Sequence, residues 1–297
     1  MADPSAGYAQ AYSDGRHSVG LCLDDMDDRQ FDDWTRLLEQ RMGLFIAPER
    51  RSFLVSGIRA RVRATGCGSP REYFDQLAGG GAVQAREWSL LIDCLTVHET
   101  CFFRHQSSIR LLKDLLLPET VGADRGYLAW SVGCATGEEV YSLAMQIDDG
   151  LPAVPEKRLF GVTGTDISLP SLRHARNGIY LKRRLRGIPE AFQDRYCESV
   201  SDNRFQIAGQ LRKRVCFSQL NLRDLAKAPM AKVDLIYCQN LLIYFDRERR
   251  LEVVADMVKF LRPGGVLILG PGELLDWHHS NMEKVRYPDT LAYRRTN

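Results

Sequence analysis

The chain has 297 residues, which is enough for about two ordinary domains of roughly 150 residues each. With 44% hydrophobic and 26% charged residues it has the composition of a globular protein, which excludes a wholly disordered or collagen-like chain. The 40 basic and 38 acidic residues leave a formal charge of +2, so the molecule as a whole has no strong polyanion-binding character.

Neither a membrane span nor a secretion signal is visible. No stretch approaches the roughly 20 consecutive apolar residues of a bilayer-spanning helix, and residues 1–20 lack the basic-then-apolar order of a signal peptide. The eight cysteines are scattered, without the spacing of a zinc or iron–sulfur site. We therefore expect a cytoplasmic protein with reduced thiols and no metal ion.

The first hundred residues predict a tail and a small all-helical domain. Residues 1–26 are mostly small or polar and are expected to be disordered. Residues 27–100 are predicted to form the helical domain, because apolar residues recur at helical spacing and glycines separate the segments. Four helices are expected, at about 31–43, 48–64, 71–77 and 84–94.

After Tyr127 short apolar runs alternate with helical stretches, which is typical of a parallel sheet covered by helices. Residues 101–297 are therefore predicted to form an α/β domain, in which residues 181–216 break the alternation and form a small inserted lobe. Strands are expected at 128–132, 159–165, 233–237 and 266–269, and an antiparallel hairpin at 284–294. Ser168 and Asp246 are predicted helix caps. The helix after Asp246 is expected to turn five apolar residues inward: Leu251, Val254, Ala255, Val258 and Leu261.

The turn after the first predicted strand contains two glycines and two acids, in the sequence Ser131-Val132-Gly133-Cys134-Ala135-Thr136-Gly137-Glu138-Glu139. Glycines at 133 and 137 allow a ligand close to the backbone at the carboxyl end of the sheet. Acids at a helix start repel a pyrophosphate but suit a cationic sulfonium. Asp166, after the next strand, either binds an adenosine ribose or caps a helix. Together these features favour S-adenosylmethionine over NAD.

Five motifs occur in a fixed order: Thr96–Arg104 (TVHETCFFR), Ala135–Ser142 (ATGEEVYS), Thr165–Ile167 (TDI), Ser218–Leu222 (SQLNL) and Tyr237–Asp246 (YCQNLLIYFD). In this order they resemble the motifs of CheR-type chemoreceptor glutamate methyltransferases. The resemblance runs from Phe31 to Arg294. It implies an α/β fold with a Rossmann-like methyltransferase sheet, a helical N-terminal domain for receptor docking and an inserted β-rich lobe.

The resemblance also implies an activity, namely methyl transfer from S-adenosylmethionine to glutamate side chains of a chemoreceptor's cytoplasmic helical bundle. The products are glutamate methyl esters and S-adenosylhomocysteine. Arg104 and Tyr244 are the implied catalytic residues that face the methyl acceptor. The implied cofactor contacts are His98, Thr100, Arg104, Glu139, Asp166, Asn221, Leu222, Cys238 and Gln239.

The residue types suit this chemistry. A glutamate carboxylate with a pKa of roughly 4.3 is ionised at neutral pH, so its attack on a methyl carbon requires positioning and no general base. Arg104 can hold a carboxylate with its planar fork, and Tyr244 can donate a hydrogen bond. The structural alternatives are a solvated arginine at a helix end and a core aromatic. His98 stands where the family usually has Asn, and its alternative is a buried structural histidine.

Two arginines of the helical domain are candidates for contact with a receptor. Arg59 and Arg63 lie one helical turn apart on the second predicted helix and either meet an acidic receptor surface or form a solvated face. We expect that the protein binds no nucleic acid, because the Asp/Asn-Pro-Pro-aromatic turn and the Pro-Cys nucleophile of nucleic-acid methyltransferases are missing. We also expect a monomer. The rival function is a non-catalytic adaptor that binds the nucleoside as a signal and docks on a receptor-like partner.

Overall fold

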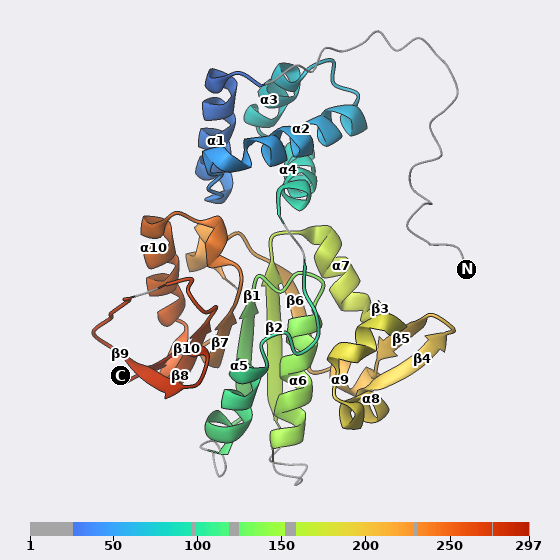
Figure 1. The fold of residues 1–297 in the computed structure, drawn as a ribbon, viewed down its shortest axis with the longest axis vertical. Helices are drawn as coiled ribbons and strands as arrows, with labels where there is room; N and C mark the ends of the chain where they lie inside the picture. Colours follow the sequence, from blue (N-terminus) through green and yellow to red (C-terminus); the bar gives the residue numbers. More distant parts are fainter. Residues whose placement is uncertain are drawn as a thin grey trace.

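The computed structural model describes residues 26–96, 99–118, 125–151, 159–228, 231–274 and 276–296. It consists of a helical domain, a seven-stranded mixed sheet flanked by helices, and a small three-stranded lobe. Figure 1 shows the helical domain at one end of the sheet and the lobe to one side. The predicted disordered tail, apart from Met26, lies outside the described residues.

The helical domain contains α1 (Asp28–Met42), η2 (Pro48–Arg50), α2 (Arg51–Thr65), α3 (Pro70–Ala78) and α4 (Ala82–Leu95). Local signals set its helix ends. Asp27 forms a capping box with Gln30, and Gly43 and Gly66 end α1 and α2 in the left-handed conformation. The Ser69 side chain caps α3. The predicted helices were therefore right to within a few residues at each end.

The sheet has the order β6-β2-β1-β7-β8-β10-β9, in which the first five strands run parallel and β10 pairs antiparallel with both β8 and β9. Its strands are β1 (Tyr127–Val132), β2 (Phe160–Asp166), β6 (Val215–Gln219), β7 (Val233–Cys238), β8 (Leu261–Leu269), β9 (Met282–Tyr287) and β10 (Thr290–Arg295). The chain builds outward from β1 to β2 and β6, then returns to place β7 on the other side of β1. This reversal creates a ligand-binding crevice at the carboxyl ends of β1 and β7.

Helices cover both faces of this sheet. They are α5 (Gln106–Leu111) with its π-helical continuation η3 (Leu112–Leu116), α6 (Glu138–Gly150), α7 (Leu169–Asn177) and α10 (Arg247–Val258), with the short 3-10 segments η7 (Leu222–Lys227) and η8 (Leu242–Tyr244) in loops. Ile236 and Cys238 of β7 belong to the core shared with α10 and the helical domain, whereas Leu235 and Tyr237 belong to the core shared with α5 and α6. Alternate residues of one strand thus supply two hydrophobic cores.

The inward face predicted for α10 was partly wrong. Val254 and Val258 are buried as expected, but Leu251 is 39% exposed. Val253 and Met257 complete the buried stripe instead. Leu261 is buried as the first residue of β8, because this strand begins before the Gly264-Gly265 pair that was expected to precede it.

The inserted lobe is a three-stranded antiparallel sheet of order β3-β5-β4. It contains β3 (Ile179–Leu181), η6 (Lys182–Gly187), α8 (Glu190–Tyr196), β4 (Cys197–Ser201), β5 (Arg204–Ile207) and α9 (Gly209–Arg212). The lobe was expected at residues 181–216. In the structure its first strand starts at Ile179, while Val215 and Cys216 already pair with β2 in the main sheet. The predicted fold class, including the β-rich lobe, is confirmed.

Candidate active site

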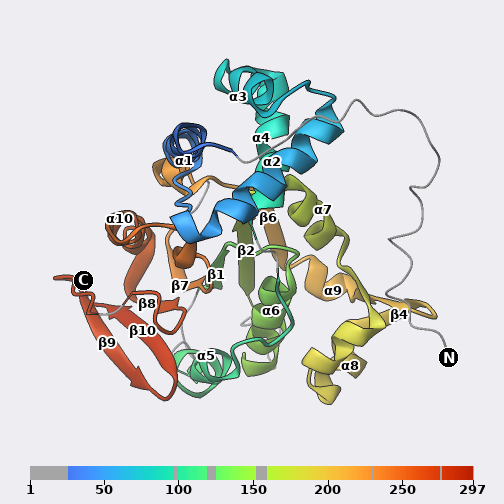
Figure 2. The ribbon, with the colours of Figure 1, turned by 45° about the horizontal axis from the view of Figure 1, so that its top comes forward.

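A cavity of about 390 Å³ lies at the carboxyl ends of the central strands, under the helical domain. Strand ends contribute Val132 from β1 and Asp166 from β2, and the helical domain contributes Met42, Leu44 and Arg50. Figure 2 shows α2 crossing above this edge of the sheet. The cavity therefore has walls from both domains.

Eight of the ten predicted site residues line this cavity: Thr100, Arg104, Glu139, Asp166, Asn221, Leu222, Gln239 and Tyr244. Cys238 is not among the lining residues, and its side chain is fully buried in the core on the α10 side. The physical reason is the two-residue period of a strand, which turns Tyr237 toward the cavity and Cys238 away. His98 lies outside the described residues.

Asp166 has a structural task in the site. Its Oδ2 accepts a hydrogen bond of 2.8 Å from the backbone N–H of Ala135, and its Oδ1 accepts one of 2.8 Å from Ser168. The first bond holds the glycine-containing turn, in which Gly133 has φ of +77° and Gly137 of +91°. The helix-cap alternative for Asp166 was wrong, because the side chain of Ser168 caps α7. The ribose-binding alternative stays a prediction for a residue that lines the cavity.

Glu139 has a carboxyl on the cavity wall whose pKa is raised above its ordinary value. Its Oε1 accepts a hydrogen bond of 2.7 Å from the Ser131 hydroxyl. Burial raises the pKa of the Glu139 carboxyl to about 8, and the like charge of Glu273 adds to the increase, while the Arg104 guanidinium opposes it. At neutral pH this carboxyl is therefore largely protonated until a cation approaches it.

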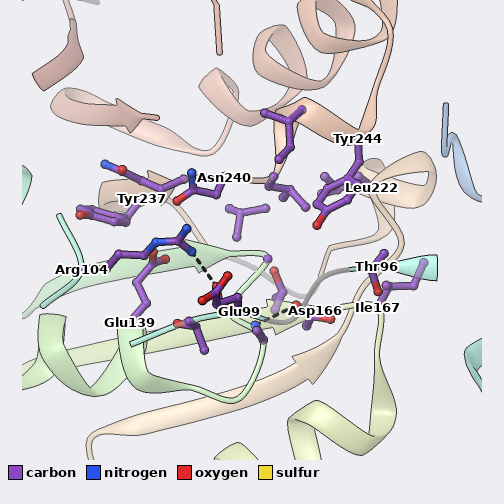
Figure 3. Close-up of a pocket in the computed structure, with 18 of the residues that line it drawn as sticks. Thr96, Glu99, Arg104, Glu139, Asp166, Ile167, Leu222, Tyr237, Asn240 and Tyr244 are labelled. Atoms are coloured by element: carbon purple, nitrogen blue, oxygen red, sulfur yellow. Dashed lines mark hydrogen bonds between the residues drawn. The ribbon is translucent and has the colours of Figure 1, made fainter. Parts of the chain in front are cut away.

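Arg104 lies on the acidic side of the cavity. Its Nη1 donates a hydrogen bond of 2.6 Å to the backbone carbonyl of Glu99. Figure 3 shows it among Glu99, Glu139 and Tyr237, while Tyr244 lies near Leu222 on the other side of the view. The two predicted catalytic residues thus occupy different parts of one cavity.

Tyr244 is held by its neighbours in sequence and by the helical domain. It ends η8 and is 8% exposed. Its carbonyl accepts a hydrogen bond of 2.9 Å from the Phe45 N–H of the loop after α1. Just before η8, Asn240 has φ of +57°, and its Oδ1 lies 2.7 Å from Nε2 of His105. These contacts set the position of the Tyr244 ring at the cavity wall.

Two polar groups of the cavity test whether a nucleoside cofactor fits. Gln239 is 5% exposed and donates from Nε2 to the Ser108 hydroxyl at 2.9 Å, but its buried Oε1 has no partner among the described residues. An orphaned acceptor at a cavity wall favours a ligand with an amino group. Asn221 is less available, because its Nδ2 donates to the Arg41 carbonyl at 3.0 Å.

Several residues that line the cavity were not predicted from the sequence. Glu99 and His105 lie inside or beside the recognised motif of residues 96–104 and could have been found from it. Met42, Leu44 and Arg50 lie about fifty residues earlier, and nothing in the local pattern indicates that they reach the cavity.

The fold and this cavity define an α/β protein of the doubly wound class, with a nucleoside-sized pocket at its topological switch point. Residues 98–290 match the family model "CheR methyltransferase, SAM binding domain", and residues 29–96 match "CheR methyltransferase, all-alpha domain". The chain therefore belongs to the CheR methyltransferase family, whose larger domain binds S-adenosylmethionine (SAM).

Curated relatives agree with this family assignment. The chain is 31% identical to chemotaxis protein methyltransferase 2 of Vibrio cholerae, over 92% of this chain and 94% of that protein. It is 29% identical to the chemotaxis protein methyltransferase of Escherichia coli, over 84% and 85%. It is 34% identical to the probable biofilm formation methyltransferase WspC of Pseudomonas aeruginosa over 92% of this chain, but spans only 62% of that protein.

Among solved structures, magnesium protoporphyrin IX methyltransferase from Synechocystis PCC 6803 with bound SAM aligns with 80% of this chain and 97% of its own, at 15% identity and a TM-score of 0.37. Within the described part of the chain, no helix is long and apolar enough to cross a membrane. No group of three or more His, Cys, Asp or Glu residues there could hold a metal ion.

Proposed function

We propose that the protein transfers the methyl group of SAM to glutamate side chains on the cytoplasmic domain of a chemoreceptor. The products are a glutamate γ-methyl ester and S-adenosylhomocysteine (SAH). The observation that carries this proposal is the cavity at the switch point, where the half-buried carboxyl of Glu139 and the carboxylate of Asp166 suit a cationic nucleoside. Membership of the CheR family supports the choice of cofactor.

The residues fit the cofactor in three ways. Glu139 gains its negative charge when a cation is bound, the Asp166 carboxylate lines the cavity where it can accept from ribose hydroxyls, and the orphaned Oε1 of Gln239 can accept from an amino group. Thr100, Leu222 and the predicted His98 and Asn221 complete the proposed contacts. When bound, SAM supplies an electrophilic methyl group on a sulfonium. The fit uses no metal ion.

The chain's own residues orient the acceptor and exclude water. A glutamate with an ordinary pKa of roughly 4.3 is already a nucleophile at neutral pH, so the site requires no base. We expect Arg104 and Tyr244 to contact the reacting groups, with the Tyr244 hydroxyl donating to a carboxylate oxygen. The mostly apolar lining of the cavity, with Leu241, Phe245 and Ile109, favours desolvation of the acceptor once it enters.

Docking is proposed to involve the helical domain. Arg63 is exposed on α2 and Arg59 is half-buried one turn earlier. These arginines are proposed to meet the acidic surface of the helical bundle in a receptor's cytoplasmic domain. We propose accordingly that the protein works in the cytoplasm, and that it acts as a monomer.

The test is incubation of the purified protein with methyl-labelled SAM and candidate receptor cytoplasmic fragments. We expect label on the fragment that is released as methanol by mild alkali, because carboxyl methyl esters hydrolyse in base. Fragments whose acceptor glutamates are replaced by aspartate serve as controls and should remain unlabelled. Alkali-stable label would contradict a carboxyl ester. SAH binding with no labelled receptor would favour the rival adaptor function.

A further inference from the structure

The cavity has two sides of different chemistry. On one side Arg104 donates a hydrogen bond to the Glu99 carbonyl and lies near the Glu139 carboxyl (Figure 3). The other side is built where the loop after α1 meets η8, through the hydrogen bond from Phe45 to Tyr244. That side is formed mainly by aromatic and aliphatic side chains: Leu44, Ile243, Tyr244 and Phe245.

Arg50 is the cation on this second side. It ends η2 and precedes α2, lines the cavity and is half-buried. Its guanidinium carbon lies 4.7 Å from the centre of the Phe53 ring and 6.0 Å from the centre of the Tyr244 ring. These aromatic contacts hold the guanidinium against the wall that also carries the Tyr244 hydroxyl.

Arg50 differs from Arg51 and Arg61 in that it forms no ion pair with a carboxylate of the described residues. Arg51 forms an ion pair of 2.6 Å with Asp28, and Arg61 one of 2.8 Å with Glu87. No carboxylate of the described residues forms an ion pair with Arg50. A half-buried cation without a counter-charge binds an incoming anion more strongly than a solvated or paired one.

We propose that Arg50 binds the carboxylate of the incoming glutamate beside Tyr244 and makes the site select glutamate over glutamine. This inference rests on the proposed function and deepens it. A guanidinium donates two parallel N–H bonds to a carboxylate, whereas the amide of glutamine offers one acceptor oxygen and an NH₂ that faces the guanidinium unfavourably. Arg50 adds this selectivity from the helical domain, so that domain contributes to the catalytic cavity as well as to docking.

The cofactor is a second source of carboxylate, because the methionine part of SAM also carries one. The test therefore separates cofactor from acceptor. Binding of SAH alone is measured first, by calorimetry, for wild type, R50Q, R50K and R36Q. Arg36 is an exposed arginine of α1 outside the cavity and serves as the matched control for loss of one charge. We expect SAH dissociation constants within about twofold of wild type in all four, given that none of these changes removes a cofactor contact.

The second measurement uses the ternary complex with saturating SAH, which cannot react. A receptor fragment with glutamate at the acceptor position is compared with the same fragment carrying glutamine there. Wild type and R36Q should bind the glutamate fragment about 10- to 100-fold more tightly than the glutamine fragment. This ratio of dissociation constants is the range expected for one charge-assisted hydrogen-bond pair. In R50Q this ratio should fall to about one, and R50K should retain part of it. The kcat/KM for the glutamate fragment should fall by a similar factor in R50Q.

Each outcome has a defined meaning. An unchanged glutamate-to-glutamine ratio in R50Q would overturn the inference while the proposed function stands. A weaker SAH complex in R50Q, with the ratio unchanged, would assign Arg50 to the cofactor instead. If wild type methylates no receptor fragment, the proposed function fails, and the inference about its acceptor fails with it. Circular dichroism and thermal unfolding of R50Q, compared with wild type, establish that the variant is folded.

Discussion

The chemistry of single side chains in the cavity is set mainly by burial and by neighbouring charges. Glu139 shows this most clearly, because burial and the like charge of Glu273 make its ionisation unfavourable until a cation arrives. Arg104, beside it, favours the ionised form. The Glu139 carboxyl is thus neutral when the cavity is empty and charged when the cavity holds a cationic ligand.

This property predicts a pH dependence of cofactor binding. The Glu139 carboxyl has a pKa of about 8 in the unliganded protein, so binding of a sulfonium cation below that pH releases a proton. The affinity for SAM should rise with pH and level off above about 8. The affinity for SAH, which has no sulfonium, should rise less. Titration calorimetry in buffers of different ionisation enthalpy measures the released proton directly.

The variant E139Q should remove this pH dependence, and E283Q, at an exposed position of β9, should preserve it. The same raised pKa of Glu139 also makes the stability of the fold depend on pH. Because the folded-state pKa lies above the ordinary value of 4.5, the free energy of unfolding of the unliganded protein falls as pH rises from about 4.5 to about 8. Equal pH profiles for SAM and SAH would contradict the placement of Glu139 near the sulfonium.

At the scale of elements, two loops decide the shape of the cavity. The first is the turn between β1 and α6, held by Asp166 through the Ala135 N–H. Within it Gly137 has φ of +91°, and a Cβ there would lie 2.7 Å from the Cβ of Ala175 in α7. Backbone conformation and space both require glycine at this position.

The substitution G137A is therefore expected to lower the free energy of unfolding by about 1–3 kcal/mol and to weaken SAH binding, because the turn must move away from α7. Thermal unfolding and calorimetry measure the two effects. The control is G209A in α9, where φ is ordinary and no atom lies within 4 Å of the added Cβ. A wild-type SAH affinity in G137A would show that this turn does not contact the cofactor.

The second loop is the segment 240–245, which carries Tyr244. Glu273 is 4% exposed, and its Oε2 accepts a hydrogen bond of 2.9 Å from the Gly270 N–H. The backbone amides of Asn240, Leu242 and Ile243 also stabilise its charge, although its Oε1 reaches none of them with full hydrogen-bond geometry. On the other side, Arg250 donates from Nε to the Phe245 carbonyl at 2.8 Å.

We expect E273Q to misplace Tyr244, because a glutamine NH₂ would face backbone donors. Turnover should fall about tenfold, a loss comparable to one hydrogen bond, while SAH affinity changes little. The variant should also lower the pKa of Glu139, since it removes a like charge. The pH profile of SAM binding would then shift to lower pH, which general destabilisation would not cause. The exposed E252Q of α10 is the control.

At the scale of the whole molecule, the two domains share a continuous hydrophobic core. The cluster that contains Trp34 and Leu54 of the helical domain also contains Val254 of α10 and Leu269 of β8. Polar contacts join the domains as well, because Asn221 and Arg223 donate to carbonyls at the end of α1. The cavity is therefore walled by two domains that are held together.

The net charge near zero makes long-range attraction of the whole protein to an acidic partner weak, so docking must depend on local charge. Charge reversal of Arg59 and Arg63 should weaken receptor binding by about tenfold or more at low salt, and by less at high salt. SAH affinity should stay unchanged. Surface plasmon resonance over a salt series measures the first effect. Equal loss of receptor and cofactor binding would indicate a structural role for these arginines.

Much of the molecule follows from local sequence. Helix ends at Gly43, Gly66 and Ser69, and the caps at Ser168 and Asp246, were predictable because each depends on one residue and its nearest neighbours. The alternation of strands and helices determined the class of fold, and ordered motifs determined the family. The carboxyl ends of parallel strands always share one edge, which is why most predicted site residues meet there.

Other features were decided only by tertiary structure. Strand register turned Cys238 into the core, and the packing of α10 exposed Leu251. The position of Arg50 beside Tyr244 and the hydrogen bond from Phe45 to Tyr244 depend on how the helical domain packs on the sheet. No local pattern encodes these contacts, because they join segments far apart in the chain, and their geometry is fixed only when the hydrophobic cores close.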